Sequence, residues 1–167
     1  GGEEHCAVLI GSGANSDTPL VRLHSQCITG DILGSLKCDC GDQLKAAMQL
    51  MANSGGGILV YLAQEGRDIG LLNKMRAYAL QDDGLDTVEA NHALGFQTDE
   101  RLFLPATRIL QALNVSKIRL ITNNPDKIYQ LEQHGIQVLA RVPLALDSNP
   151  HNRQYLKTKK ARTGHLI

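Results

Sequence analysis

Three of the four cysteines in this chain lie close together in the stretch CITGDILGSLKCDCG, as Cys27, Cys38 and Cys40. In extended chain, side chains two positions apart point the same way, so Cys38 and Cys40 can reach one ion. The loop that precedes them is long enough to bring Cys27 back beside them. Thiolates are preferred ligands of zinc, which is usually four-coordinate. The pattern therefore predicts a zinc site with three protein ligands and a fourth position for water, as expected of a catalytic site.

Other uses of these thiols stay open from the residues alone. Buried free cysteines are common, although glycine and aspartate flank this group instead of core residues. Cys6 could complete a site of four thiolates for zinc or an iron–sulfur cluster, but its apolar, strand-like surroundings favour a packed thiol. The zinc site of nucleobase deaminases is excluded, because it needs a glutamate two positions after the first ligand and a C-x-x-C pair. Here Thr29 follows Cys27, and the chain has no C-x-x-C.

Polar residues also gather where two expected strands end. QEGRDIG follows the apolar run 57–63, and TNNPDK follows the run 117–122. Ligands of α/β sheets collect at the carboxyl ends of strands, and helix N-termini attract phosphate. Lys127 would lie in a first helical turn, where its charge opposes the helix dipole and suggests a nearby anion. Each cluster alone is more typical of a solvated loop, and no GxxxxGK[ST] phosphate loop is present.

The elements that must position these residues alternate between strand and helix patterns. Alternation of this kind predicts a layered α/β/α single domain over residues 1–167, with a mixed, largely parallel sheet. The expected helix at 70–83 carries Leu72, Met75 and Ala79 on one apolar stripe, and YLKTKKARTGH is expected to be a basic tail. We expect strands at 6–10, 19–24, 57–63, 117–122 and 136–144, and helices at 42–54, 70–83, 105–114 and 125–134.

Composition limits the classes of partner. The 167 residues include 17 Lys and Arg and 17 Asp and Glu, so the formal net charge is zero. We expect neither a nucleic acid nor a membrane as partner, since anionic surfaces require excess positive charge and no apolar run reaches the roughly 18 residues of a membrane helix. Nothing suggests export, so we expect a cytoplasmic protein with reduced thiols. Because the chain opens close to a strand-like run, we also expect an N-terminal segment to be missing.

A series of short motifs, in order along the chain, resembles GTP cyclohydrolase II. The motifs are RLHSQCITGD, CDCG, QEGRDIGLLNK, AYALQD, DTVEANH, LGF, DER and TNNPDK, and the resemblance extends from about Val21 to the end. It implies a hydrolase that opens the imidazole ring of GTP in the first step of riboflavin biosynthesis. The implied products are formate, pyrophosphate and 2,5-diamino-6-ribosylamino-4(3H)-pyrimidinone 5′-phosphate. The implied cofactors are Zn²⁺ and Mg²⁺, and the implied assembly is a homodimer.

The resemblance also implies roles for single residues. Cys27, Cys38 and Cys40 would be the zinc ligands. Tyr78, Asp99 and Arg101 would be catalytic, with Asp99 as proton acceptor and Arg101 as the nucleophile proposed for the family. The residues that match GTP contacts are Arg22, Leu23, His24, Ser25, Gln26, Gln43, Glu65, Gly66, Arg67, Thr87, Thr122 and Lys127. One of them departs from the family pattern, since glutamate is expected where Gln26 stands.

Two questions stay open at this point. A guanidinium pKa above about 12 disfavours the neutral form that a nucleophile needs, so Arg101 is more simply a clamp on the α-phosphate. The rival functions are a zinc-stabilised module that senses GTP without opening it, and a hydrolase for another purine triphosphate. Tyr78, Asp99 and Arg101 favour the enzyme, because a pure binder has no reason to hold them together with three cysteines.

Overall fold

The structure is a computed structural model that describes residues 3–166. Its residues group into two compact units, each made of three stretches of chain. The first unit comprises Gly1–His24, Gln43–Ala63 and Leu102–Ala145, and the second comprises Ser25–Asp42, Gln64–Arg101 and Leu146–Ile167. The expectation of one domain over residues 1–167 stays a prediction. No helix within residues 3–166 is long and apolar enough to cross a membrane.

The first unit is built on a five-stranded sheet in the order β1-β3-β2-β4-β5. Strands β1 and β3 pair antiparallel, whereas β4 pairs parallel with both β2 and β5. The predicted mixed, largely parallel sheet is therefore confirmed. The strands are β1 (Cys6–Ile10), β2 (Leu20–Ser25), β3 (Gly57–Leu62), β4 (Lys117–Ile121) and β5 (Gln137–Val142).

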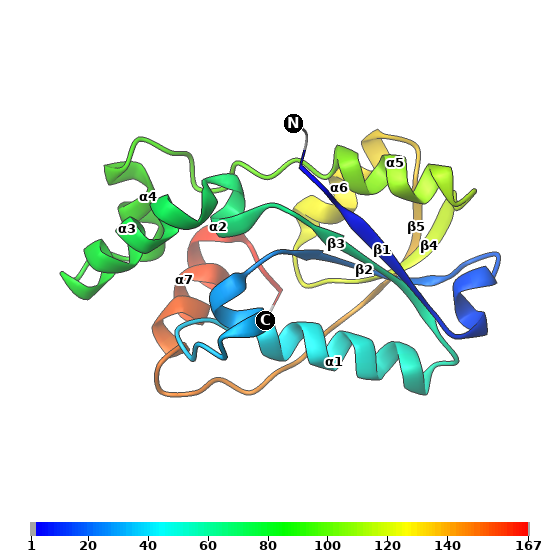
Figure 1. The fold of residues 1–167 in the computed structure, drawn as a ribbon, viewed down its shortest axis with the longest axis horizontal. Coiled ribbons are helices and arrows are strands. Elements are labelled where there is room, and N and C mark those ends of the chain that lie inside the picture. Colours follow the sequence, from blue (N-terminus) through cyan, green and yellow to red (C-terminus); the bar gives the residue numbers. More distant parts are fainter. Residues whose placement is uncertain (1–2, 167) are drawn as a thin grey trace. The chain divides into compact units, whose positions relative to one another are not determined.

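Helices cover both faces of this sheet, as Figure 1 shows with α1 (Cys40–Asn53) on one side and α5 (Leu104–Ala112) and α6 (Pro125–Gln133) on the other. Alternate residues of each strand supply the two cores. Ile58 and Val60 of β3 pack with the α5 and α6 side, and Leu59 between them packs with Met51 of α1. Successive side chains of a strand point to opposite faces of the sheet. Because helices cover both faces, nearly every residue of a central strand such as β3 is buried, and its sequence is an unbroken apolar run. The layered α/β/α prediction is confirmed for this unit.

The second unit contains the three clustered cysteines and, among its described residues, five helical elements. They are a single π-helical turn η2 (Ile28–Ile32), α2 (Glu65–Asp68), α3 (Gly70–Asp82), α4 (Thr87–Ala93) and α7 (Arg153–Thr163). The expected basic tail is basic, but it was not expected to be a helix: Arg153–Thr163 is helical, and its Lys159 is buried beside Asp39. Helix α4 was not anticipated either, although a capping box formed by Asp86 and Glu89 opens it.

Helix α3 buries a different face from the one that its apolar stripe suggests. Leu72 is 65% exposed and Met75 38% exposed, whereas Lys74 is 8% exposed and Ala77 4% exposed. The helix therefore places a lysine toward the interior of its unit and its larger apolar side chains toward the surface.

Candidate active site

The sulfurs of Cys27, Cys38 and Cys40 lie together in the second unit, all within 4.8 Å of one another. The Cys27 and Cys38 sulfurs are 3.7 Å apart, and both residues are buried. Tetrahedral zinc with bonds of about 2.3 Å places its sulfur ligands about 3.8 Å apart. The donor set and its spacing therefore fit a zinc ion with three protein ligands. Cys6 is an exposed free thiol on β1 of the first unit, and the group does not include it.

The backbone converges on this cluster by turns instead of by the extended geometry that the sequence suggested. Cys38 lies in a bend, and Cys40 is the first residue of α1, where the positive end of the helix dipole favours a thiolate. On the other side, the Cys27 carbonyl accepts from the Asp31 amide at 2.7 Å, and the Asp31 carboxylate accepts from the Cys27 amide at 3.0 Å. These two hydrogen bonds between Cys27 and Asp31 hold the backbone of the π-helical turn and so fix the position of the Cys27 side chain.

Gly30 lies against all three cysteines. A Cβ added at this glycine would be 2.9 Å from the Cys38 sulfur, 3.1 Å from the Cys40 Cβ and 3.2 Å from the Cys27 sulfur. Real Cβ atoms essentially never come as close as 2.9 Å to another heavy atom, and the other two contacts are also well inside the optimum of about 3.5–4.0 Å. The absence of a side chain at position 30 is therefore what allows the three sulfurs to meet.

A buried lysine contacts the cluster. Lys74 Nζ donates to the Cys27 sulfur at 3.0 Å, to Thr29 Oγ1 at 2.8 Å and to Glu65 Oε1 at 2.8 Å. Burial alone would lower the pKa of Lys74, but Glu65 and Cys27 outweigh it and raise that pKa. Hydrogen bonds from Cys38 and Cys40, with a further one from Lys74, hold the pKa of Cys27 far below that of a free thiol. Sequence reasoning missed Lys74, since no spacing distinguishes it from a solvated helix lysine.

Tyr78 lies one helical turn beyond Lys74. The ammonium groups of Lys74 and Lys37 are 5.7 Å and 5.2 Å from the centre of its ring. Burial raises the pKa of Tyr78, and Lys74 and a hydrogen bond with Thr29 only partly oppose this effect. The phenol is therefore protonated at neutral pH, and it can donate a proton but cannot act as a base.

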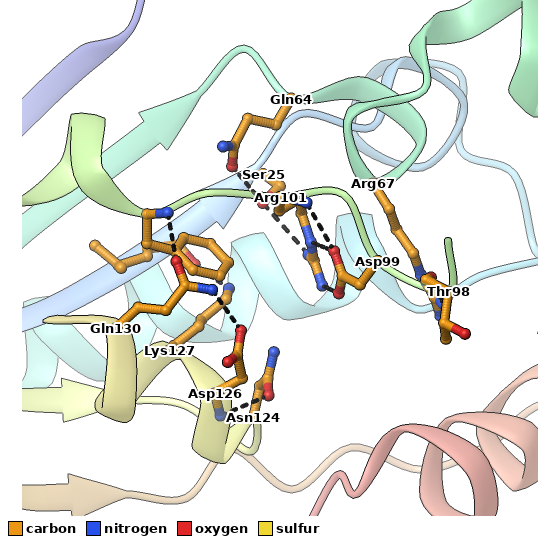
Figure 2. Close-up of polar contacts among 12 residues, drawn as sticks. Ser25, Gln64, Arg67, Thr98, Asp99, Arg101, Asn124, Asp126, Lys127 and Gln130 are labelled. Carbon is orange, nitrogen blue, oxygen red and sulfur yellow. Dashed lines mark hydrogen bonds and ion pairs between the residues drawn. The ribbon is translucent and has the colours of Figure 1, made fainter. Parts of the chain in front are cut away.

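Asp99 and Arg101 form a bidentate ion pair in the second unit. The guanidinium Nε donates to Asp99 Oδ1 at 2.8 Å and its NH2 donates to Oδ2 at 2.5 Å. Arg101 NH1 also donates to Ser25 Oγ at 3.4 Å, and Ser25 Oγ in turn donates to Gln64 at 3.4 Å (Figure 2). Burial opposes the charge of each partner, but their mutual contacts lower the pKa of Asp99 and raise that of Arg101. Both groups stay ionised, and this state favours the clamp over the nucleophile.

The turn at Gly66, Arg67 and Asp68 holds a strained backbone. Their φ angles are 64°, 63° and 74°, all in the left-handed region, which costs a residue with a side chain about 1–2 kcal/mol. The turn is tied to the segment before Arg101, because Arg67 NH1 donates to the Thr98 carbonyl at 3.0 Å, as Figure 2 shows, and the Arg67 carbonyl accepts from the amide of Glu100. Because Arg67 is hydrogen-bonded to the residues on either side of Asp99, this strained turn helps to position the ion pair of Asp99 and Arg101.

Six of the expected substrate contacts belong to the first unit. The guanidinium of Arg22 is buried and donates to Gln43 Oε1 at 2.5 Å and to the Ile121 carbonyl at 3.1 Å. Lys127 Nζ, also buried, donates to the Leu23 carbonyl at 2.8 Å. The other two are His24, whose ring stacks on Tyr61, and Thr122, whose hydroxyl accepts from the Asn124 amide at 3.0 Å.

The loop that holds Thr122 is itself tightly bonded. Asn124 caps α6 by accepting from the Asp126 amide, and Gln130 donates to Asp126 and accepts from the Phe103 amide (Figure 2). A rigid loop at the end of β4 suits the recognition of a ligand by its backbone and amide groups.

The other six expected contacts belong to the second unit. Ser25 and Arg67 take part in the network around Arg101, and Gly66 begins the strained turn. Glu65 is buried, and its two oxygens accept from Lys74 and from the amides of Ile28 and Gly66. Half-buried Gln26 precedes Cys27, and Thr87 is the first residue of α4.

Comparison with known proteins identifies the family. The family model described as GTP cyclohydrolase II matches residues 1–143. The chain is 52% identical over 167 residues to a GTP cyclohydrolase-2 of Azospirillum brasilense. This match covers all of the chain but only 43% of that longer relative. It is 54% identical over 166 residues to the GTP cyclohydrolase-2 of Klebsiella pneumoniae strain 342 and 55% over 165 residues to that of Hamiltonella defensa. These two matches cover 99% of this chain and 83% and 84% of the relatives. With three sulfurs in position for one ion and relatives of this similarity along its whole length, the chain belongs to the GTP cyclohydrolase II family.

Proposed function

We propose that the chain is a zinc-dependent hydrolase that opens the imidazole ring of GTP and releases formate and pyrophosphate. The product would be 2,5-diamino-6-ribosylamino-4(3H)-pyrimidinone 5′-phosphate, which begins riboflavin biosynthesis. The observation that carries this proposal is the convergence of Cys27, Cys38 and Cys40 within 4.8 Å in a chain of this family. Mg²⁺ would accompany the triphosphate, and we further propose a homodimer in the cytoplasm.

The residues around the sulfurs suit this chemistry. Ring opening requires water to add at C8 of guanine, the C8–N9 bond to break, and a second hydration to release the carbon as formate. Zinc held by the three sulfurs would supply a nucleophile at neutral pH by lowering the pKa of water. Tyr78 is protonated and would donate a proton to a nitrogen that becomes basic as the ring opens.

The triphosphate needs cations of fixed geometry. Arg101 is held by the Asp99 carboxylate at 2.5 and 2.8 Å and keeps its charge, so we propose that it clamps the α-phosphate while pyrophosphate leaves. Asp99 would then orient the guanidinium, because a carboxylate of lowered pKa is a weak proton acceptor. A covalent phosphoryl-arginine trapped during turnover would assign Arg101 as the nucleophile instead.

The test is incubation with GTP, Zn²⁺ and Mg²⁺, with separate assays for formate and pyrophosphate. The proposal expects both products from the wild type and no formate from Cys38→Ser, which loses one sulfur of the cluster. Recovery of bound but intact GTP would identify a nucleotide sensor instead. Turnover of another purine triphosphate in preference to GTP would reject the substrate assignment.

A further inference from the structure

We infer that Lys74 is a positioning residue of the metal centre, which acts through Cys27 and sets how firmly the three sulfurs retain zinc. The inference rests on the proposed function, since it assumes that the cysteine cluster holds the ion. The starting observation is that a lysine on α3 is 8% exposed and that its Nζ lies 3.0 Å from a sulfur.

The contacts of Lys74 use the whole ammonium group. Lysine has three N–H donors and no acceptor. The structure gives three acceptors at hydrogen-bond distance, namely the Cys27 sulfur, Thr29 Oγ1 and Glu65 Oε1. All three N–H donors of the Lys74 ammonium are therefore used, and the hydrogen bonds to Thr29 and Glu65 fix the orientation of the one to the Cys27 sulfur.

Glu65 holds the lysine in this direction. Its Oε2 accepts from the Ile28 amide at 2.7 Å, and its Oε1 accepts from the Gly66 amide at 2.8 Å. Ile28 directly follows the cysteine that Lys74 contacts, so one carboxylate ties the lysine and the metal loop to the same point. A movement of Lys74 away from the sulfur would break contacts on both sides.

Charge gives this arrangement its effect on the metal. Three thiolates around a divalent ion leave one net negative charge, which the nearby ammonium of Lys74 offsets. A hydrogen bond to a thiolate withdraws electron density from the sulfur and fixes its direction. Partners of this kind commonly change metal affinity by about 10–100-fold when they are removed.

A purely structural role for Lys74, as the counterion of buried Glu65, makes different predictions. The two residues form an ion pair at 2.8 Å with 9% of each side chain exposed. If the pair matters only for folding, removal of either charge should have the same consequence for the metal. If the contact with sulfur matters, the lysine variant, which removes the contact, should change zinc retention more than the glutamate variant, which only loosens it.

The experiment compares four zinc-loaded proteins with the wild type: Lys74→Met, Glu65→Gln, the double variant Lys74→Met/Glu65→Gln, and Lys37→Met. Lys37 is the matched control, because its ammonium also faces the Tyr78 ring but pairs with exposed Asp82 and not with sulfur. The first readout is the rate at which zinc passes to a chromogenic chelator. The second is the sulfur-to-cobalt charge-transfer band of the cobalt-loaded proteins, which reports electron density on the thiolates without any turnover.

We expect Lys74→Met to lose zinc about 10–100-fold faster than the wild type and to shift the charge-transfer band to longer wavelength. Lys37→Met should stay close to the wild type in both readouts. Glu65→Gln keeps an amide oxygen that can accept from Lys74 but loses an acceptor for the Ile28 amide, so its effect on both readouts should be clearly smaller than that of Lys74→Met. The double variant buries no unpaired charge and should fold, but it should lose zinc as fast as Lys74→Met.

The outcomes separate the two proposals. A wild type that retains no zinc would overturn the proposed function and the inference with it. A wild type that retains zinc, together with unchanged readouts in the double variant, would overturn only the role of Lys74. Equal effects of Glu65→Gln and Lys74→Met would likewise reject it in favour of the counterion role.

Discussion

Replacement of Gly30 by alanine tests whether the three sulfurs depend on the empty space between them. The new methyl group would lie 2.9 Å and 3.2 Å from two sulfurs and 3.1 Å from the Cβ of the third cysteine. Each distance is shorter than the optimum of about 3.5 Å or more, so all three ligands must shift together. Overpacking of this size costs about 1–3 kcal/mol.

This cost should fall on the zinc-bound form. Without the ion the sulfurs can move apart and relieve the contact, whereas zinc requires them to stay about 3.8 Å from one another. At 1.4 kcal/mol for each factor of ten, the predicted loss in zinc affinity is about 5–140-fold.

The measurement is a zinc competition with a chelator of known affinity, with the wild type, Gly30→Ala and Ile32→Ala. Ile32 lies in the same π-helical turn and is 72% exposed, so it controls for a change in that loop. Thermal unfolding of the metal-free proteins should differ little between the three. Gly30→Ala that binds zinc as tightly as the wild type would refute the reasoning, because the methyl group would then have room that the structure denies it.

Three further predictions concern the rest of the second unit. Tyr78→Phe should retain zinc but release formate about 10²–10⁴-fold more slowly, because it lacks the proton donor, and unchanged turnover would remove Tyr78 from the mechanism. Asp99→Asn should be less stable than the wild type at neutral pH. Because the pKa of Asp99 is lowered by its ion pair, the contribution is complete above the ordinary carboxyl pKa of about 3.9 and is lost as the pH falls through the native value. Urea unfolding should show that the free energies of unfolding of the wild type and Asp99→Asn differ less at acid pH than at neutral pH. A difference that does not change with pH would contradict this prediction. Lys159→Met should lower the free energy of unfolding measured in urea, because it removes an ammonium that pairs with the buried Asp39 carboxylate at 3.2 Å, whereas exposed Lys157→Met should change it little.

Sequence patterns predicted the first unit well because its elements follow simple periods. The apolar run 57–63 contains β3, which is buried on both faces, and the helix expected at 125–134 contains α6. The cysteine cluster was also predictable, since three thiols of this spacing have few uses in one loop. The bend at Cys38 and the helix that starts at Cys40 were not predicted, because two residues with one between them look the same in a strand and in a turn.

The second unit misled the same reasoning for a physical reason. Sequence patterns assume that apolar side chains face inward, but α3 buries Lys74 and exposes Leu72. The basic stretch that contains Lys159 was expected only to be a basic tail, yet it forms α7 and pairs the Lys159 ammonium with buried Asp39. In both helices a charged side chain found a buried partner from a distant part of the sequence, and no local pattern contains that information.

These two failures have a common origin in how the second unit is stabilised. Both apolar clusters of the described residues belong to the first unit. The second unit instead buries ion pairs, Glu65 with Lys74 and Asp39 with Lys159, and each pair touches or adjoins a cysteine of the cluster. Buried ion pairs add little net stability, because desolvation offsets their attraction, but a bound ion adds its binding energy to folding. The metal centre would then be the core of this unit, and residues that look misplaced by hydrophobic rules are placed to complete it.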